Sequence, residues 1–462
     1  MSQLRIDWPN FCIFTEMRLL YLFILLSLFS CKYEKYEPAP NTTPLAECID
    51  GHAKFTLDGK DYEFECDGYN LMGYVSLDEM NAEFGNDSWG WTDSQTGKEY
   101  ALMGVDNGTA IVDISIPTAP LYLGKIPTAT ENSSWRDIKV YDDHVFIVSE
   151  APGHGMQVFD LKQLRGLDSK QNFTADHVYT GFGQAHNIAI NEESGYAYIA
   201  GSRGKGIYAF NISNPLSPTM ELEAPNFGYS HDAQIVYYKG PDERYAGKEI
   251  YVGSNEDRVI IVDVTNKSNP ILISEFKYDE NVVDNDQYTH QAWLTQDHKY
   301  LLLGDEFDEL QKGCKDSGYV NCDLVDNVKT YVIDFQDLEN PKLDFVYKSD
   351  LEGIDHNGYV IDHKFFQASY TNGLRVVDII NIDQKSFVEI GFFDTHNNNH
   401  DNNLIKKNHH QSASDPDGHD GIKGEKIASM TGAWSVYPFF NSENIIISDI
   451  ISGLFIVKRK AN

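Results

Sequence analysis

The sequence has few basic residues for its acidic content. It contains 37 lysine and arginine residues against 70 aspartate and glutamate residues, and its formal net charge at pH 7 is −33. Phosphate backbones and anionic membrane surfaces repel a chain with this charge. The composition therefore argues against a nucleic-acid partner, and we interpret the acidity as a solubilising surface.

Signatures of common catalytic sites are also missing. The chain has no GxSxG elbow, no HExxH, no P-loop and no dinucleotide fingerprint after a strand. A carboxylate pair for glycoside cleavage could still lie among the 70 acidic residues. The sequence leaves enzymatic activity open and favours a binding protein.

Long hydrophobic runs are absent except near the N-terminus. Residues 17–31 read MRLLYLFILLSLFSC, which is the layout of a secretory signal with an apolar core too short to span a bilayer. The segment resembles bacterial lipoprotein signals, in which the cysteine is lipidated. We expect residues 1–16 to precede the true start of translation, residues 17–30 to be a signal peptide and Cys31 to carry lipid.

The polar, proline-bearing residues 31–47 are typical of a tether that holds a domain away from a membrane. These features predict an exported monomer, lipid-anchored to a bacterial membrane. We expect the outer membrane of a Gram-negative cell, with the protein at the cell surface or facing the periplasm.

Cysteine is scarce, and four of the six residues form two close pairs. Cys48 and Cys66 bracket a predicted hairpin, 48–66, that contains an Asp-Gly turn, and Cys314 and Cys322 bracket a short loop. In an exported protein such pairs predict two local disulfides. Zinc is less favoured because neither pair has the CxxC spacing of metal knuckles.

One unit recurs between about residues 86 and 458. An extended run ends in an aspartate or asparagine turn with a proline, as in GTAIVDISIPTAPLYLG, KGIYAFNISNPLSPTMEL, DRVIIVDVTNKSNPILISEF and KTYVIDFQDLENPKLDFVY, and three weaker copies make seven. Each unit except the last contains four short runs rich in β-branched and aromatic residues. Four strands in roughly 40 to 60 residues predict an all-β fold, a seven-bladed β-propeller over 67–458.

The last unit ends without its fourth strand, at GLFIVKRKAN. Residues 69–77, YNLMGYVSL, are similar to the fourth strands of the other units. We predict that they pair with the last blade and remove an open sheet edge.

The units look like LVIVD repeats. Together with SSWRDIKVYDDHVFIVSEAPGHGMQVFDL, SHDAQIV, GDEFDE and GAWSVYPFF, they make the region 86–458 resemble the bacterial surface family called choice-of-anchor B. The resemblance implies a propeller-like domain held at the cell surface, here by lipid, and implies no catalytic activity. The polar, histidine-rich insertion at 397–430 departs from the expected pattern.

Histidine or tryptophan recurs at the start of the first strand of each unit. The aligned residues are Trp89, Trp135, His186, His231, His290, His356 and Trp434. In a propeller this strand lies innermost, so we expect these side chains at the mouth of the central channel or between blades.

Two interpretations of this ring remain open. In the structural one, each side chain packs on the next blade and hydrogen-bonds a backbone carbonyl. In the functional one, the four histidines converge with Asn187, Asp232, Gln291 and Asn357 to hold a transition metal or an anionic ligand. The tryptophans would then add a stacking wall for a sugar or aromatic ligand.

Two other segments could bind metal ions. Asp305, Glu306 and Asp308 cluster in GDEFDEL and suit Ca²⁺, although a solvated acidic loop explains them as well. His396 directly precedes the insertion, which contains His400, His409, His410 and His419, and its DPDGHDG lacks the final glutamate of an EF-hand. We interpret the insertion as a polar loop with opportunistic metal affinity.

The sequence therefore predicts a lipid-anchored surface propeller that binds a protein or a polysaccharide. The alternative is a metal-dependent hydrolase or lyase with its site at the channel mouth.

Overall fold

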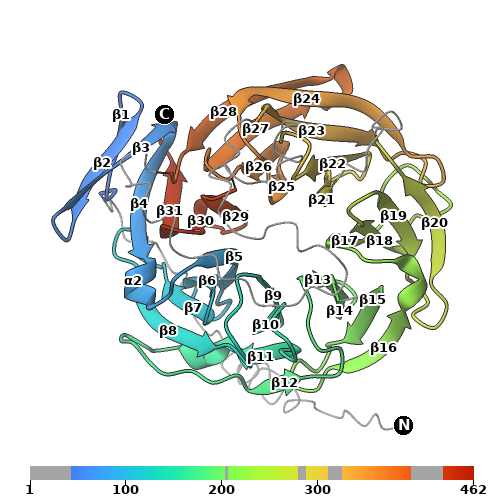
Figure 1. Cartoon of the computed structure of the whole chain (residues 1–462), viewed down its shortest axis with the longest axis horizontal. Coiled ribbons are helices and arrows are strands. Elements are labelled where there is room, and N and C mark those ends of the chain that lie inside the picture. The colour runs from blue at the N-terminus through green and yellow to red at the C-terminus, as the bar shows by residue number, and fades with distance from the viewer. Residues whose placement is uncertain (1–42, 203–205, 279–287, 311–324, 397–429, 462) are drawn as a thin grey trace, which may run out of the picture.

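The structure is a computed structural model that describes residues 43–202, 206–278, 288–310, 325–396 and 430–461 (Figure 1). No helix within these ranges is long and apolar enough to cross a membrane.

Several predicted features lie outside the described residues. They are the upstream segment 1–16, the signal peptide 17–30, Cys31 and most of the tether, the pair Cys314 and Cys322, and residues 397–429 of the insertion.

Antiparallel sheets are arranged in a ring around a central axis, which confirms the predicted all-β propeller (Figure 1). Six sheets have four strands. Two of them are formed by β5 (Gly85–Thr92), β6 (Glu99–Val105), β7 (Gly108–Asp113) and β8 (Leu121–Pro127), and by β9 (Arg136–Tyr141), β10 (His144–Ser149), β11 (Met156–Asp160) and β12 (His177–Tyr179). The next two are formed by β13 (Asn187–Asn191), β14 (Tyr196–Ala200), β15 (Ile207–Asn211) and β16 (Thr219–Ala224), and by β17 (Asp232–Tyr237), β18 (Glu249–Ser254), β19 (Val259–Asp263) and β20 (Ile271–Phe276). The last two are formed by β21 (Thr289–Leu294), β22 (Tyr300–Asp305), β23 (Asn327–Asp334) and β24 (Lys342–Glu352), and by β29 (Ala433–Tyr437), β30 (Asn444–Asp449) and β31 (Gly453–Arg459) with β4 (Tyr69–Ser76).

The remaining sheet is seven-stranded. It contains β25 (Gly358–Ile361), β26 (Lys364–Ala368), β27 (Leu374–Asn381) and β28 (Ser386–Phe393), followed by β3 (Lys60–Asp67), β2 (His52–Leu57) and β1 (Cys48–Ile49). The sequence predicts seven four-stranded blades. The number is wrong, because only six sheets have four strands. The reason is that β3 pairs with the outer strand β28, an addition that the repeat pattern alone does not reveal.

Helices are few and short in the described residues. They are the α-helix α2 (Leu77–Met80) and the 3₁₀ turns η1 (Leu161–Leu164), η2 (Pro225–Phe227) and η3 (Ile382–Gln384). Ser76 ends β4 and caps α2, because its hydroxyl accepts a hydrogen bond from the backbone N–H of Glu79.

The N-terminal strand β4 completes the last sheet. It pairs with β31 in a register that runs from Gly453 opposite Ser76 to Arg459 opposite Tyr69, and the two strands lie side by side in Figure 1. This pairing bears out the prediction for residues 69–77. It joins the two ends of the described chain into one sheet and leaves β31 no open edge.

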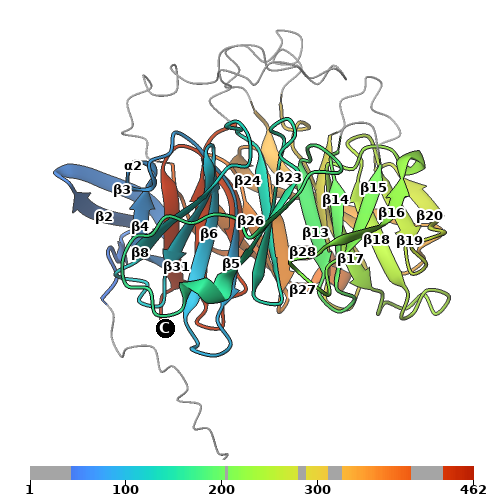
Figure 2. The same ribbon diagram turned by 90° about the horizontal axis from the view of Figure 1, so that it is seen from below.

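The hairpin before β4 carries the predicted disulfide. Cys48 and Cys66 are bonded, which confirms this pair. Seen edge-on, β2 and β3 project from the rim of the disc (Figure 2). Phe55 and Tyr62 stack at 4.8 Å between ring centroids, and Tyr62 lies 5.9 Å from Tyr74 of β4, so aromatic contacts hold the hairpin against the closing strand.

The sheets pack face to face, and this determines the pattern of their strands. Every residue of β6 and of β7 is buried, because neighbouring sheets cover both faces. A short continuous apolar run is the expected sequence of such a strand. Outer strands such as β20 are largely exposed. The first strand of each sheet lies innermost and contacts the first strand of the next sheet, which closes the ring around the channel.

Candidate functional site

A cavity of about 300 Å³, which includes space open to solvent, lies at one end of the central channel. Its lining residues are Asp87, Trp135, Arg136, Asp137, His186, Asn187, His231, Asp232, His290, His356, Asn357 and Trp434. Six of the seven residues predicted for the channel-mouth ring are among them, and Trp89 is not.

The four histidines of the ring lie next to one another. Ring centroids are 4.0 Å apart for His186 and His231, 4.4 Å for His231 and His290, and 4.2 Å for His290 and His356. Trp434 continues the series at 4.6 Å from His356. Each of these residues stands at or near the start of the innermost strand of its sheet, so the ring geometry brings together residues far apart in the sequence.

The Nδ1 atoms of three histidines are fixed by neighbouring groups. His231 Nδ1 lies 3.2 Å from the backbone oxygen of His290, and His356 Nδ1 lies 2.6 Å from that of Trp434. His186 Nδ1 lies 2.6 Å from Glu150 Oε1. Contacts to a neighbouring sheet are what the structural interpretation expects, and a fixed Nδ1 also holds the other ring nitrogen in a set direction.

Glu306 reaches the same histidines from the segment after β22. Its carboxylate oxygens lie 3.7 Å from His290 Nε2 and 3.9 Å from His356 Nε2. The Tyr370 hydroxyl donates a hydrogen bond to it. Glu306 is only 8% exposed, and burial raises its pKa to about 7.

Burial and neighbouring rings keep two imidazoles neutral. Burial lowers the pKa of His356 to about 3. Burial, with the nearby His356 and His231, lowers the pKa of His290 well below its ordinary value. Burial also opposes the charged form of His186, but Glu150 outweighs it and the pKa of His186 is raised. Neutral imidazole is the form that binds metal ions.

The three carboxylates predicted to bind Ca²⁺ contact different partners in the structure. Asp305 accepts hydrogen bonds from the backbone N–H groups of Phe307 and Tyr288, and Asp308 pairs with Lys329 at 2.9 Å. Only Glu306 reaches the channel. In the described part of the chain, the one group of three potential metal ligands that lie within 4.8 Å of one another is His231, His290 and Glu306.

The polar residues that follow the ring histidines in the sequence form hydrogen bonds between neighbouring sheets. Asn187 and Gln291 both donate to Asp232 Oδ2, at 3.0 and 3.2 Å. The backbone N–H of Ile188 donates to Asp137 at 2.7 Å, and that of Gly358 to Gln291 at 2.6 Å. Burial raises the pKa of Asp232 to about 7. The sequence indicated most of this layer as neighbours of the histidines but missed Asp87 and Asp137.

The first two predicted tryptophans occupy different places. Trp135 lines the cavity together with the next residue, Arg136, whose Nε donates to the backbone oxygen of Val105 in the neighbouring sheet at 3.3 Å and whose Nη1 lies 2.9 Å from His154 Nε2. Trp89 lies two residues after Asp87, and its ring contacts Tyr437 at 5.0 Å and Tyr359 at 6.0 Å. It therefore belongs to an aromatic layer of the channel beyond the cavity lining.

Comparison with protein families decides the nature of the repeated unit. The profile described as LVIVD repeat matches residues 98–128, 182–223 and 246–278. The chain contains LVIVD repeats. The three matched LVIVD segments contain strands of three of the four-stranded sheets, those of β6 to β8, β13 to β16 and β18 to β20.

Three solved structures are similar to the chain at low sequence identity. No curated protein matches the chain. A Myceliophteria thermophila Cps50 (Swd1) beta-propeller domain is 9% identical, with a TM-score of 0.49, and the match covers 85% of this chain and 100% of that one. Hydrazine synthase of Kuenenia stuttgartiensis is 10% identical with a TM-score of 0.47, covering 78% and 92%. A protein from Lactobacillus plantarum is 14% identical with a TM-score of 0.42, covering 68% and 81%.

Proposed function

We propose that this protein is a binding module of the bacterial cell surface that holds a polysaccharide ligand at the mouth of its channel. In this proposal all seven sheets act as blades of one rigid ring of the choice-of-anchor B kind. A rigid ring that presents a concave site to a partner is a common use of such scaffolds.

The observation that carries the proposal is that three residues of the cavity lining have buried polar atoms without partners. Among the described residues, Asn187 Oδ1, Asp87 Oδ1 and Arg136 Nη2 have no hydrogen-bond partner. Leaving such atoms unpaired costs about 1–3 kcal/mol each. Two of them accept and one donates, and sugar hydroxyl groups can satisfy both kinds.

Aromatic side chains at the same cavity support a sugar ligand. Trp135 and Trp434 line the cavity and stay partly exposed. Indole faces stack on the apolar faces of sugar rings and fix their orientation. A protein side chain could use the same contacts, so a protein ligand is the alternative outcome of the test.

We expect Trp434→Ala to weaken the binding of a soluble oligosaccharide about 10-fold or more, because a buried aromatic contact contributes at least about 1.4 kcal/mol. The full chain would be screened against soluble oligosaccharides, and the affinity of a hit measured by calorimetry. Leu272→Ala is the matched control, since Leu272 lies exposed on the outer strand β20. Equal affinities for the two variants, or binding to surface proteins alone, would contradict the polysaccharide proposal.

We also propose that lipid on Cys31 anchors the chain to the membrane. The basis is the sequence of residues 17–31. Cys31→Ser should abolish metabolic labelling with a fatty-acid analogue and move the protein from the membrane to the soluble fraction. Cys12→Ser is the control and should label normally, because Cys12 precedes the proposed start of translation. Labelling of Cys31→Ser at the wild-type level would rule out this anchor.

A further inference from the structure

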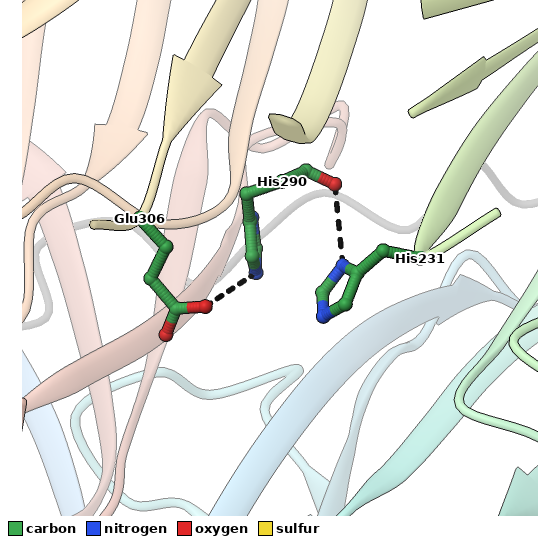
Figure 3. A group of neighbouring side chains, drawn as sticks. All are labelled: His231, His290 and Glu306. Atoms are coloured by element: carbon green, nitrogen blue, oxygen red, sulfur yellow. Dashed lines mark hydrogen bonds and ion pairs between the residues drawn. The ribbon is translucent and has the colours of Figure 1, made fainter. Parts of the chain in front are cut away.

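We propose that the channel mouth binds a divalent transition-metal ion between His231, His290 and Glu306. Figure 3 shows the three side chains, with His290 between Glu306 and His231. This site lies beyond the proposed polysaccharide binding, since it uses other side chains: Asn187, Asp87 and Arg136 belong to the sheets of β13, β5 and β9.

The distances among the ligand atoms suit a single ion after a small adjustment. One nitrogen of each histidine and one carboxylate oxygen all lie within 4.8 Å of one another. A tetrahedral ion with bonds of about 2.0–2.1 Å needs ligand atoms about 3.3 Å apart. Small rotations of the side chains are enough to close this difference, because Glu306 follows the end of β22 and its carboxylate already faces His290 Nε2.

Neighbouring groups support the ligands in the way metal sites require. His231 Nδ1 faces the backbone oxygen of His290, and the Tyr370 hydroxyl donates to Glu306. Such contacts fix the tautomer of a ligating histidine and orient a ligating carboxylate. Tyr370 thus acts as a positioning residue.

A buried nitrogen of His290 gives independent support. His290 is 2% exposed, and its Nδ1 has no hydrogen-bond partner among the described residues. An imidazole buried in this way is destabilising unless a ligand offsets the loss of hydration. An ion at Nε2, the nitrogen 3.7 Å from Glu306, would leave Nδ1 without a partner but would offset part of the hydration that the buried ring loses.

The donor atoms of the three ligands determine which ions the site would prefer. Two imidazoles and one carboxylate suit Zn²⁺, Co²⁺, Ni²⁺ or Fe²⁺, whereas Ca²⁺ and Mg²⁺ prefer oxygen ligands alone. Three protein ligands leave a coordination position for water or a ligand group. His356 stands next in line, with its Nε2 3.9 Å from the second oxygen of Glu306.

The test is metal binding by the full chain after dialysis against a chelator. Calorimetry with Zn²⁺ and mass spectrometry of bound metal should give one tightly held ion, and Co²⁺ should give the visible absorption of a low-coordination site. Glu306→Gln and His290→Ala should each weaken Zn²⁺ binding by more than 100-fold. Tyr370→Phe should weaken it about 10- to 100-fold and keep the stoichiometry, as expected for a group outside the ligand shell.

Matched controls separate this site from the other histidines and from the proposed function. Replacing His400, His409, His410 and His419 together by asparagine should leave the ion bound, and so should Trp434→Ala. Thermal melting would verify that the isosteric Glu306→Gln variant is folded. Retention of the ion by folded Glu306→Gln, its loss when the four insertion histidines are replaced, or the absence of Zn²⁺ binding to the wild-type chain would each overturn the proposal.

Discussion

Replacement of Lys139 by methionine should lower the free energy of unfolding by about 3–5 kcal/mol, the usual cost of breaking a buried ion pair by removing one partner. Lys139 Nζ lies 2.7 Å from Asp137 Oδ1 and 3.6 Å from Asp87 Oδ2, and 4.6 Å from the centroid of Trp89. The lysine side chain is 11% exposed and both carboxylates are less so. Without its charge, two buried carboxylates would face each other in the channel.

The loss of stability in Lys139→Met should be larger at higher pH. Burial raises the pKa of Asp87, whereas Lys139 brings the pKa of Asp137 below its ordinary value in spite of burial. In Lys139→Met the pKa of Asp137 should rise as well. A carboxyl whose pKa is higher in the folded state binds more protons there, so stability falls as pH increases through that value. Urea unfolding at pH 5.5 and pH 8 should therefore show the larger deficit at pH 8.

Lys98→Met is the matched control for this experiment. Lys98 also pairs with an aspartate, Asp113, at 2.8 Å, but its side chain is 35% exposed. Solvent screening limits such a pair to about 0–1 kcal/mol. Comparable losses in the two variants would refute the proposed role of Lys139, and Asp137→Asn combined with Lys139→Met should recover part of the stability.

The sequence was sufficient to predict the ring and its histidines. His186, His231, His290 and His356 each precede or begin a short apolar run, and once the repeat places those runs innermost, their convergence follows from the geometry of a propeller. The alignment misplaced Trp89. Asp87 lines the cavity as Asn187 and Asp232 do. Each of those two residues directly follows a ring histidine, so the ring position of this sheet is Asn86, and Trp89 lies three residues further along β5 (Gly85–Thr92), deeper in the channel.

Contacts between sheets explain the other differences. The sequence gives no reason to choose among the carboxylates of Asp305, Glu306 and Asp308. Only their contacts in the structure distinguish them. The Tyr370 hydroxyl, from the next sheet, holds Glu306 towards the histidines, whereas Lys329 holds Asp308 away from them. The hairpin 48–66 likewise gave no sign that it would extend a sheet, because its pairing partner β28 lies more than 300 residues later.

Substitution of Gly73 by valine should open the ring and abolish cooperative unfolding. Gly73 lies in the closing strand β4, where an added Cβ would stand 2.2 Å from the backbone oxygen of Pro117. This oxygen belongs to the turn between β7 and β8 of the neighbouring sheet, where the Pro120 ring also lies 3.0 Å from the added Cβ. The two contacts push β4 away from that turn and out of its place. Its departure would expose Leu71 and Val75, which are 0% and 1% exposed, at a cost of about 1.5–3 kcal/mol for each side chain in lost burial alone.

Loss of β4 also affects the solubility of the protein. The strand β31 would present an unpaired edge and expose apolar residues such as Phe455 and Val457, which are buried in the folded protein. Edges of this kind promote association between chains. Gly73→Val should therefore elute as large assemblies in size-exclusion chromatography and show no sharp thermal transition. Thr219→Val places the same side chain at an exposed position of the outer strand β16 and should change stability by no more than about 0.5 kcal/mol. A monomeric Gly73→Val protein with a wild-type melting temperature would show that closure by β4 does not hold the ring together.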